Sequence, residues 1–122
     1  MNKILISIGI VFISSISLAE NVAKDVWISE MQRVLPRIFC TTDQYFRQCF
    51  NVQESQCQMV ISDATNICLL TFQDQIPAQL EQPVDGTYWG SQVGMCVGNA
   101  YELTLINQKI NTATCNDPAN WQ

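Results

Sequence analysis

Six cysteines in a chain of 122 residues are the feature that most limits how this protein can fold. All six lie between residues 40 and 115, and an even number in a short exported chain is typical of a disulfide framework. Zinc binding is the competing use of cysteine, but the chain has no Cys-x-x-Cys pair and no histidine to complete a ligand set. We therefore expect three disulfide bonds formed in an oxidising compartment, and neither a metal site nor a cofactor.

The first 19 residues have the form of an export signal. Lys3 precedes an apolar run over Ile4–Ile13, and Ser17 and Ala19 place small residues before a cleavage position. The run is shorter than the ~20 apolar residues that a bilayer requires, so we expect no membrane span in the mature chain. We predict that residues 1–19 are cleaved as a signal peptide and that residues 20–122 form a single helical, disulfide-rich domain, periplasmic or secreted.

The spacing of apolar residues predicts an all-α fold, a small disulfide-stapled bundle of about four helices. The expected helices cover Val22–Phe39, with a kink or an end near Pro36, then Asp43–Phe50, Val52–Thr71 and Tyr88–Gln108. Residues 73–87 break this periodicity and are expected to form a connection, in which Asp85-Gly86 is a turn signal. Residues 111–122 are expected to form an irregular tail, held by Cys115 and Trp121.

The fourth predicted helix, Tyr88–Gln108, also allows a second interpretation, because glycine recurs in and before it at residues 86, 90, 94 and 98. On a helix these glycines would form a stripe of small residues that lets another backbone approach closely. Glycine is also a poor helix former, and the alternation of Tyr101, Leu103 and Leu105 with polar residues suits a strand. The helical spacing of Cys96, Ala100 and Leu103 favours the helix.

The spacing of the cysteines suggests a pairing. Cys57 and Cys68 fall on one face of the third predicted helix but about 16 Å apart along its axis, too far to bond each other. An antiparallel hairpin of the second and third helices would nest two bridges, Cys49–Cys57 near the turn and Cys40–Cys68 at the open end, and leave Cys96–Cys115. The architecture of this nested-disulfide helical hairpin resembles that of the twin Cys-x9-Cys proteins.

Charge and composition exclude several functions. After signal cleavage, eleven acidic and five basic residues leave a net charge of −6, which does not suit a protein that binds nucleic acid. The absence of histidine removes the usual general base and the usual partner of a nucleophilic serine or cysteine. Carboxylates such as Glu30 and Glu102 lie in no recognisable catalytic motif. We therefore expect a protein that is not an enzyme.

Residues 96–101, Cys-Val-Gly-Asn-Ala-Tyr, resemble a Cys-x-Gly-x-x-Tyr stretch of the small helical, disulfide-bonded periplasmic immunity proteins that neutralise type VI secretion amidases. This resemblance implies an inhibitor or immunity role and assigns no binding residues. The expected function is thus binding of another protein, and the acidic excess points to a basic partner. Asp74, Glu81 and Asp85, all within the 73–87 connection, are the predicted partner contacts.

Two alternatives stay open. One is a carrier of an apolar ligand or lipid, with its cavity lined by aromatic residues, namely Phe39, Phe46, Phe50, Phe72 and Trp89. In a domain this small these side chains are also needed to form the core. The other is a small hydrolase that uses two carboxylates converging on one cleft.

Overall fold

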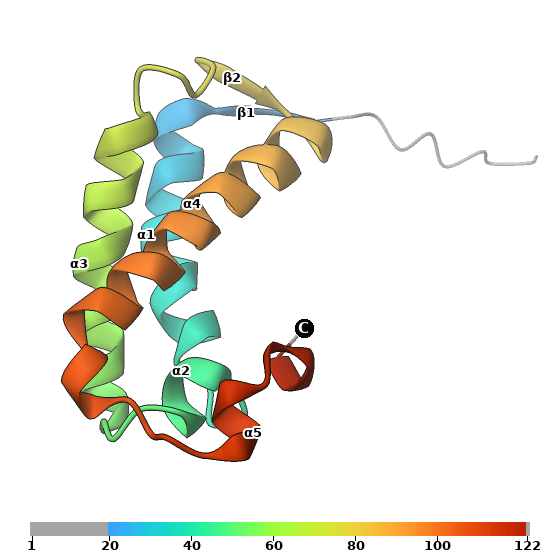
Figure 1. Cartoon of the computed structure of the whole chain (residues 1–122). Coiled ribbons are helices and arrows are strands. Elements are labelled where there is room, and N and C mark those ends of the chain that lie inside the picture. Colours follow the sequence, from blue (N-terminus) through green and yellow to red (C-terminus); the bar gives the residue numbers. More distant parts are fainter. Residues whose placement is uncertain (1–19, 122) are drawn as a thin grey trace, which may run out of the picture.

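The computed structural model describes residues 20–121 and shows a bundle of three long helices with a short two-stranded ribbon at one end (Figure 1). The predicted signal peptide, residues 1–19, lies outside the described residues. In chain order the elements are β1 (Asn21–Ala23), α1 (Lys24–Phe39), α2 (Tyr45–Gln48), α3 (Glu54–Phe72), β2 (Gln79–Glu81), α4 (Val84–Thr104), the 3-10 helix η1 (Ile106–Gln108), α5 (Ala113–Asn116) and the 3-10 helix η2 (Pro118–Trp121). The predicted small, disulfide-stapled helical fold is confirmed.

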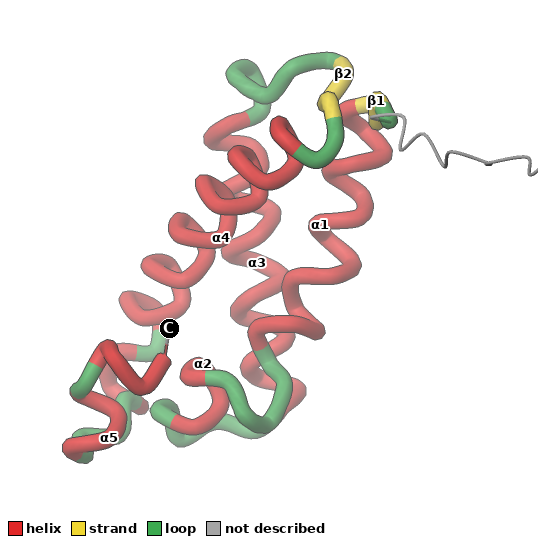
Figure 2. Tube along the Cα trace, turned by 90° about the vertical axis from the view of Figure 1, so that its right-hand side faces the viewer, coloured by secondary structure: helices red, strands yellow, loops and turns green. Residues whose placement is uncertain are grey.

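Helix α3 is the centre of the bundle, since both α1 and α4 pack against it and run in the opposite direction (Figures 1 and 2). The core forms where the apolar faces of the three helices meet, as their spacing requires. Its buried side chains include Trp27 and Leu35 of α1, Ile61 and Leu69 of α3, and Val93, Val97 and Tyr101 of α4. None of the helices between residues 20 and 121 is long and apolar enough to span a membrane.

The long helices agree closely with the sequence prediction. Helix α3 begins at Glu54 instead of Val52 and ends one residue later than expected. In α1, Pro36 does not end the helix, which continues to Phe39. The helical interpretation of the glycine-containing stretch is confirmed, although α4 begins and ends four residues earlier than predicted.

The glycines of α4 do not form the predicted close-approach stripe. A Cβ atom added at Gly90 or Gly94 would meet nothing within 4 Å. At Gly86 an added Cβ would meet the side chain of Gln82, just before the helix, and at Gly98 it would lie 3.3 Å from the ring of Phe46. The helix is therefore maintained by packing against α3 and not by a stripe of glycines.

The connection between α3 and α4 contains a strand that the sequence did not reveal. Strand β2 pairs antiparallel with β1, so that Val22 is opposite Leu80 and Asn21 is opposite Glu81. Leu80 and nearby Ile76 are buried, which attaches the connection to the end of the bundle. The first residues of the predicted helix 22–39 therefore belong to a strand, and the helix starts at Lys24.

The predicted cysteine pairing was wrong in all three bonds. The structure contains Cys40–Cys57, Cys49–Cys115 and Cys68–Cys96, in place of the predicted Cys40–Cys68, Cys49–Cys57 and Cys96–Cys115. No cysteine in the described residues is left free. The nested helical hairpin that the prediction required is also absent from this part of the chain, because α2 has only four residues.

The observed pairing follows from the direction of the helices. Helix α1 continues past Pro36, so Cys40 lies at its C-terminal end, beside the first turn of antiparallel α3 that carries Cys57. Cys68 lies eleven residues further along α3, about 16 Å away, and meets Cys96 of α4 instead. Cys49, after α2, is left to bind Cys115 of α5.

An aromatic cluster surrounds Tyr101, which is fully buried on α4. The rings of Phe46 and Phe50 each lie edge-on to the Tyr101 ring, with centroids 5.0 Å away. The Tyr101 hydroxyl donates a hydrogen bond to the carbonyl oxygen of Phe46 at 2.7 Å. Burial raises the pKa of Tyr101 to about 12, against a smaller opposing effect of the positive charge on Arg47.

The free energy of unfolding should therefore fall at alkaline pH. Because the folded pKa of Tyr101 lies above its ordinary value of 10.0, this stabilisation is complete below pH 10.0 and is lost as the pH rises through about 12. Urea denaturation should show a fall in the free energy of unfolding over this interval, and a smaller fall for Tyr101→Phe. Tyr88→Phe, at an exposed position of α4, is the control and should keep the full fall. An equal fall in Tyr101→Phe would assign the effect to other groups.

The disulfides should also differ in how much each contributes to the free energy of unfolding. Cys49 and Cys115 are 66 residues apart, whereas Cys40 and Cys57 are 17 apart, and a bond that closes a longer loop restricts the unfolded chain more. The loop-entropy relation gives a loss of about 4 kcal/mol for C49A/C115A and about 3 kcal/mol for C40A/C57A. Urea denaturation of the two double variants measures this difference. The opposite order would show that local packing outweighs loop closure.

Candidate functional site

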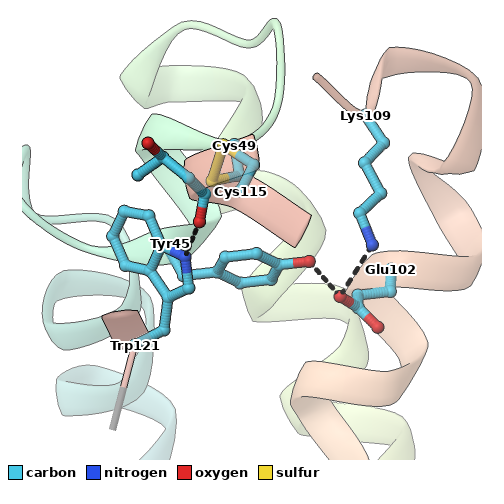
Figure 3. Close-up of polar contacts among 7 residues, drawn as sticks. Tyr45, Cys49, Glu102, Lys109, Cys115 and Trp121 are labelled. Atoms are coloured by element: carbon cyan, nitrogen blue, oxygen red, sulfur yellow. Dashed lines mark hydrogen bonds and ion pairs between the residues drawn. A yellow bond between two sulfur atoms is a disulfide. The ribbon is translucent and has the colours of Figure 1, made fainter. Parts of the chain in front are cut away.

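A pocket of about 390 Å³ opens at the end of the bundle opposite the ribbon, where three segments distant in sequence meet. We call it the Tyr45 pocket. Its lining consists of Tyr45 from α2, Glu102 from α4, Lys109 and the tail residues Cys115, Asn116, Pro118 and Trp121. Figure 3 shows the Tyr45 hydroxyl and the Lys109 ammonium both directed at the carboxylate of Glu102.

Backbone pairing places Lys109 at the pocket. The amide of Asn51 donates to the carbonyl of Gln108, and the amide of Ile110 donates to the carbonyl of Cys49, both at 2.8 Å. Phe50 and Lys109 thus form an isolated antiparallel bridge. As a result, the segment after η1 is fixed beside α2, and Lys109 faces Glu102.

The tail is fixed by one covalent bond and several local hydrogen bonds. The Cys49–Cys115 disulfide joins α5 to the end of α2. The indole nitrogen of Trp121 then donates to the carbonyl of Thr114 at 3.1 Å, which folds η2 back toward α2. The Trp121 ring packs against the Tyr45 ring, with centroids 5.6 Å apart and planes inclined at 57°.

The polar groups of the pocket form one linked set. The Tyr45 hydroxyl donates a hydrogen bond to Oε1 of Glu102, and Lys109 Nζ lies 3.7 Å from the same oxygen. Lys109 Nζ is also 5.9 Å from the centroid of the Tyr45 ring, within the range of a cation–π contact. The side chains of Lys109 and Glu102 are 34% and 38% exposed, so this ion pair is accessible from solvent.

Two groups of the pocket have shifted pKa values. Burial, followed by the hydrogen bond to Glu102, raises the pKa of Tyr45 above its ordinary value. Interaction with the Tyr45 oxygen, reinforced by Glu102, raises the pKa of Lys109. Both groups are thus protonated near neutral pH, and the pocket presents a hydroxyl and an ammonium as hydrogen-bond donors.

The predicted contact residues Asp74, Glu81 and Asp85 lie in the segments at the other end of the molecule, and of these the structure joins Glu81 and Asp85. Asp74 follows α3, Glu81 is in β2, and Asp85 is in the first turn of α4. The carboxylate of Asp85 accepts a hydrogen bond from the backbone amide of Glu81 at 2.7 Å. Glu20 and Asp25 flank the neighbouring strand β1. We call these five residues the acidic end.

The aromatic residues predicted to line a carrier cavity pack mainly against one another and against the core. Phe46 and Phe50 contact Tyr101. The ring centroids of Phe39 and Phe46 are 4.9 Å apart, and those of Phe72 and Trp89 are 6.0 Å apart.

The sequence analysis placed Tyr45 on an apolar helix face and did not single out Lys109. The signals of this site were Cys115 and Trp121, expected to hold the tail, and Glu102, a carboxylate in no recognisable motif.

A family model described as the T2SS substrate NttA, a substrate of the type II secretion system, matches residues 21–115. This region contains the three long helices, all six cysteines, and Tyr45, Glu102 and Lys109 of the pocket. No curated protein and no solved structure matches the chain. The expected resemblance to immunity proteins gains no support from these comparisons. The chain belongs to the NttA family of type II secretion substrates and is therefore an exported protein.

Proposed function

We propose that this chain acts outside the cytoplasm as a binding protein without enzymatic activity, and that it recognises a basic protein through its acidic end. The observation that carries this proposal is the concentration of five carboxylates at one end of a chain with few charges. The nearby cation, Lys24, donates a hydrogen bond to the backbone carbonyl of Gln73. The acidic end thus has an excess of negative charge.

The distribution of the other charges supports this assignment. Arg33 forms an ion pair with Glu30 in the middle of α1, and Arg47 donates to the carbonyl of Cys40 near α2. Lys109 belongs to the pocket at the far end. We therefore expect the negative charge beside the ribbon to attract a basic surface and speed the encounter.

The rigidity of the acidic end also favours binding. Glu81 is fixed in the ribbon by its pairing with Asn21, and Asp85 is held by its hydrogen bond to the Glu81 amide. Cys68–Cys96 joins the two helices that lead into and out of this end. A preformed surface loses little conformational entropy when it binds, so more of the interaction energy remains as affinity. Inhibition of a basic enzyme or toxin is one function that such a surface would serve.

The test is the association of the oxidised chain with immobilised poly-L-lysine at several salt concentrations. The variant Asp74→Asn/Glu81→Gln/Asp85→Asn should bind about tenfold more slowly at low salt, because it loses the steering field. The difference should shrink as salt rises, since exposed charges are screened beyond about 10 Å at 0.1 M.

A matched control removes the same net charge elsewhere. Asp43→Asn/Glu54→Gln/Asp63→Asn changes three exposed carboxylates outside the acidic end. This control should slow association much less than the first variant does. Equal slowing in the two variants would mean that net charge alone governs binding, and would contradict the assignment to the acidic end.

A further inference from the structure

The Tyr45 pocket lies far from the acidic end and combines two aromatic rings with a balanced charge pair. We propose that this pocket binds a neutral saccharide, with the sugar ring against Tyr45 and Trp121 and its hydroxyls on Glu102, Lys109 and Asn116. This site is independent of the proposed recognition of a basic protein, because it shares no residue with the acidic end.

The aromatic side of the pocket suits the C–H face of a sugar ring. Tyr45 and Trp121 present neighbouring rings at 5.6 Å, and Pro118 extends the apolar lining. The indole N–H of Trp121 is already satisfied by the carbonyl of Thr114, so the ring has its π surface left to offer a ligand. Figure 3 shows the Trp121 ring beside the Tyr45 side chain, whose hydroxyl points at Glu102.

The polar side of the pocket suits hydroxyl groups. A hydroxyl both donates and accepts hydrogen bonds, and here acceptors and a donor lie close together. Glu102 supplies carboxylate oxygens, and Lys109 supplies an ammonium group 3.7 Å from one of them. The amide nitrogen of Asn116 donates to Asn111, and its carbonyl oxygen can accept from a ligand. Adjacent sugar hydroxyls could therefore be bound by neighbouring groups.

The balance of charge selects against ionic ligands. An anion at Lys109 would also face Glu102, and a cation at Glu102 would also face Lys109. Either ion would lose hydration while gaining one attraction and one repulsion. A neutral polyhydroxyl ligand avoids this cost and still uses both groups. The volume of about 390 Å³ lies at the small end of the range of ligand sites, roughly 300–1,000 Å³, which suits a short stretch of a glycan.

The test is a titration of the oxidised chain, followed by the indole N–H signals in a two-dimensional NMR spectrum. The probes are four neutral trisaccharides: maltotriose, cellotriose, laminaritriose and triacetylchitotriose. At least one of them should shift the signal of Trp121 saturably. Trp27, which is buried, and Trp89, which packs on Phe72, serve as internal references and should move little.

Variants of the pocket give the quantitative test. Trp121→Ala should weaken binding of the active trisaccharide about tenfold, because it removes the stacking surface. Tyr88→Ala removes an exposed aromatic ring of α4 outside the pocket and should leave the affinity unchanged. Circular dichroism of each variant confirms that the fold is intact.

A second variant tests the charge argument directly. Lys109→Met leaves the Glu102 carboxylate without its counter-charge, so chitotriose with protonated amines should gain affinity relative to the active neutral trisaccharide. The proposal is overturned if none of the four neutral trisaccharides shifts the Trp121 signal saturably. It is equally overturned if the native chain binds oligogalacturonate or protonated chitotriose more tightly than every neutral sugar.

Discussion

The attachment of α3 to both of its neighbours is the constraint on which the rest of the structure depends. Cys57 joins the beginning of α3 to the end of α1, and Cys68 joins its later part to the middle of α4. The two half-cystines occupy one side of α3, between the two helices that pack on it. With α3 fixed in this way, the register of both neighbouring helices is set, and four glycines can be accommodated in α4.

The sequence predicted the features that depend on local periodicity. The regular recurrence of apolar residues in α3 located that helix within two residues of its observed ends, and the spacing of Cys96 and Ala100 correctly favoured a helix for α4. Features that depend on distant partners were missed. Strand β2 has only three residues and is stabilised by β1, which lies nearly sixty residues earlier in the chain. A segment that short carries no alternation that could be recognised.

The cysteine pairing failed for a related reason. The prediction required α2 to be a full arm of a hairpin, although only Tyr45–Gln48 are helical, and it allowed α1 to end near Pro36, although α1 continues to Phe39. Small differences in helix length changed which cysteines meet. The Tyr45 pocket was missed along with the pairing, since its wall is brought to α2 by Cys49–Cys115, a contact across 66 residues. The acidic end was easier to foresee because three of its residues are close in sequence.

The bond between Cys49 and Cys115 also determines at which stage the pocket can be completed. When the chain is synthesised, in a compartment that keeps thiols reduced, α5 and Trp121 have no covalent attachment to α2. The wall beside Tyr45 becomes permanent only after the chain reaches an oxidising compartment. The long helices bury their own apolar faces, so this step completes the pocket on a bundle with its own core. Completion of the Tyr45 pocket thus depends on oxidation of Cys49 and Cys115, a step that follows export from a reducing compartment.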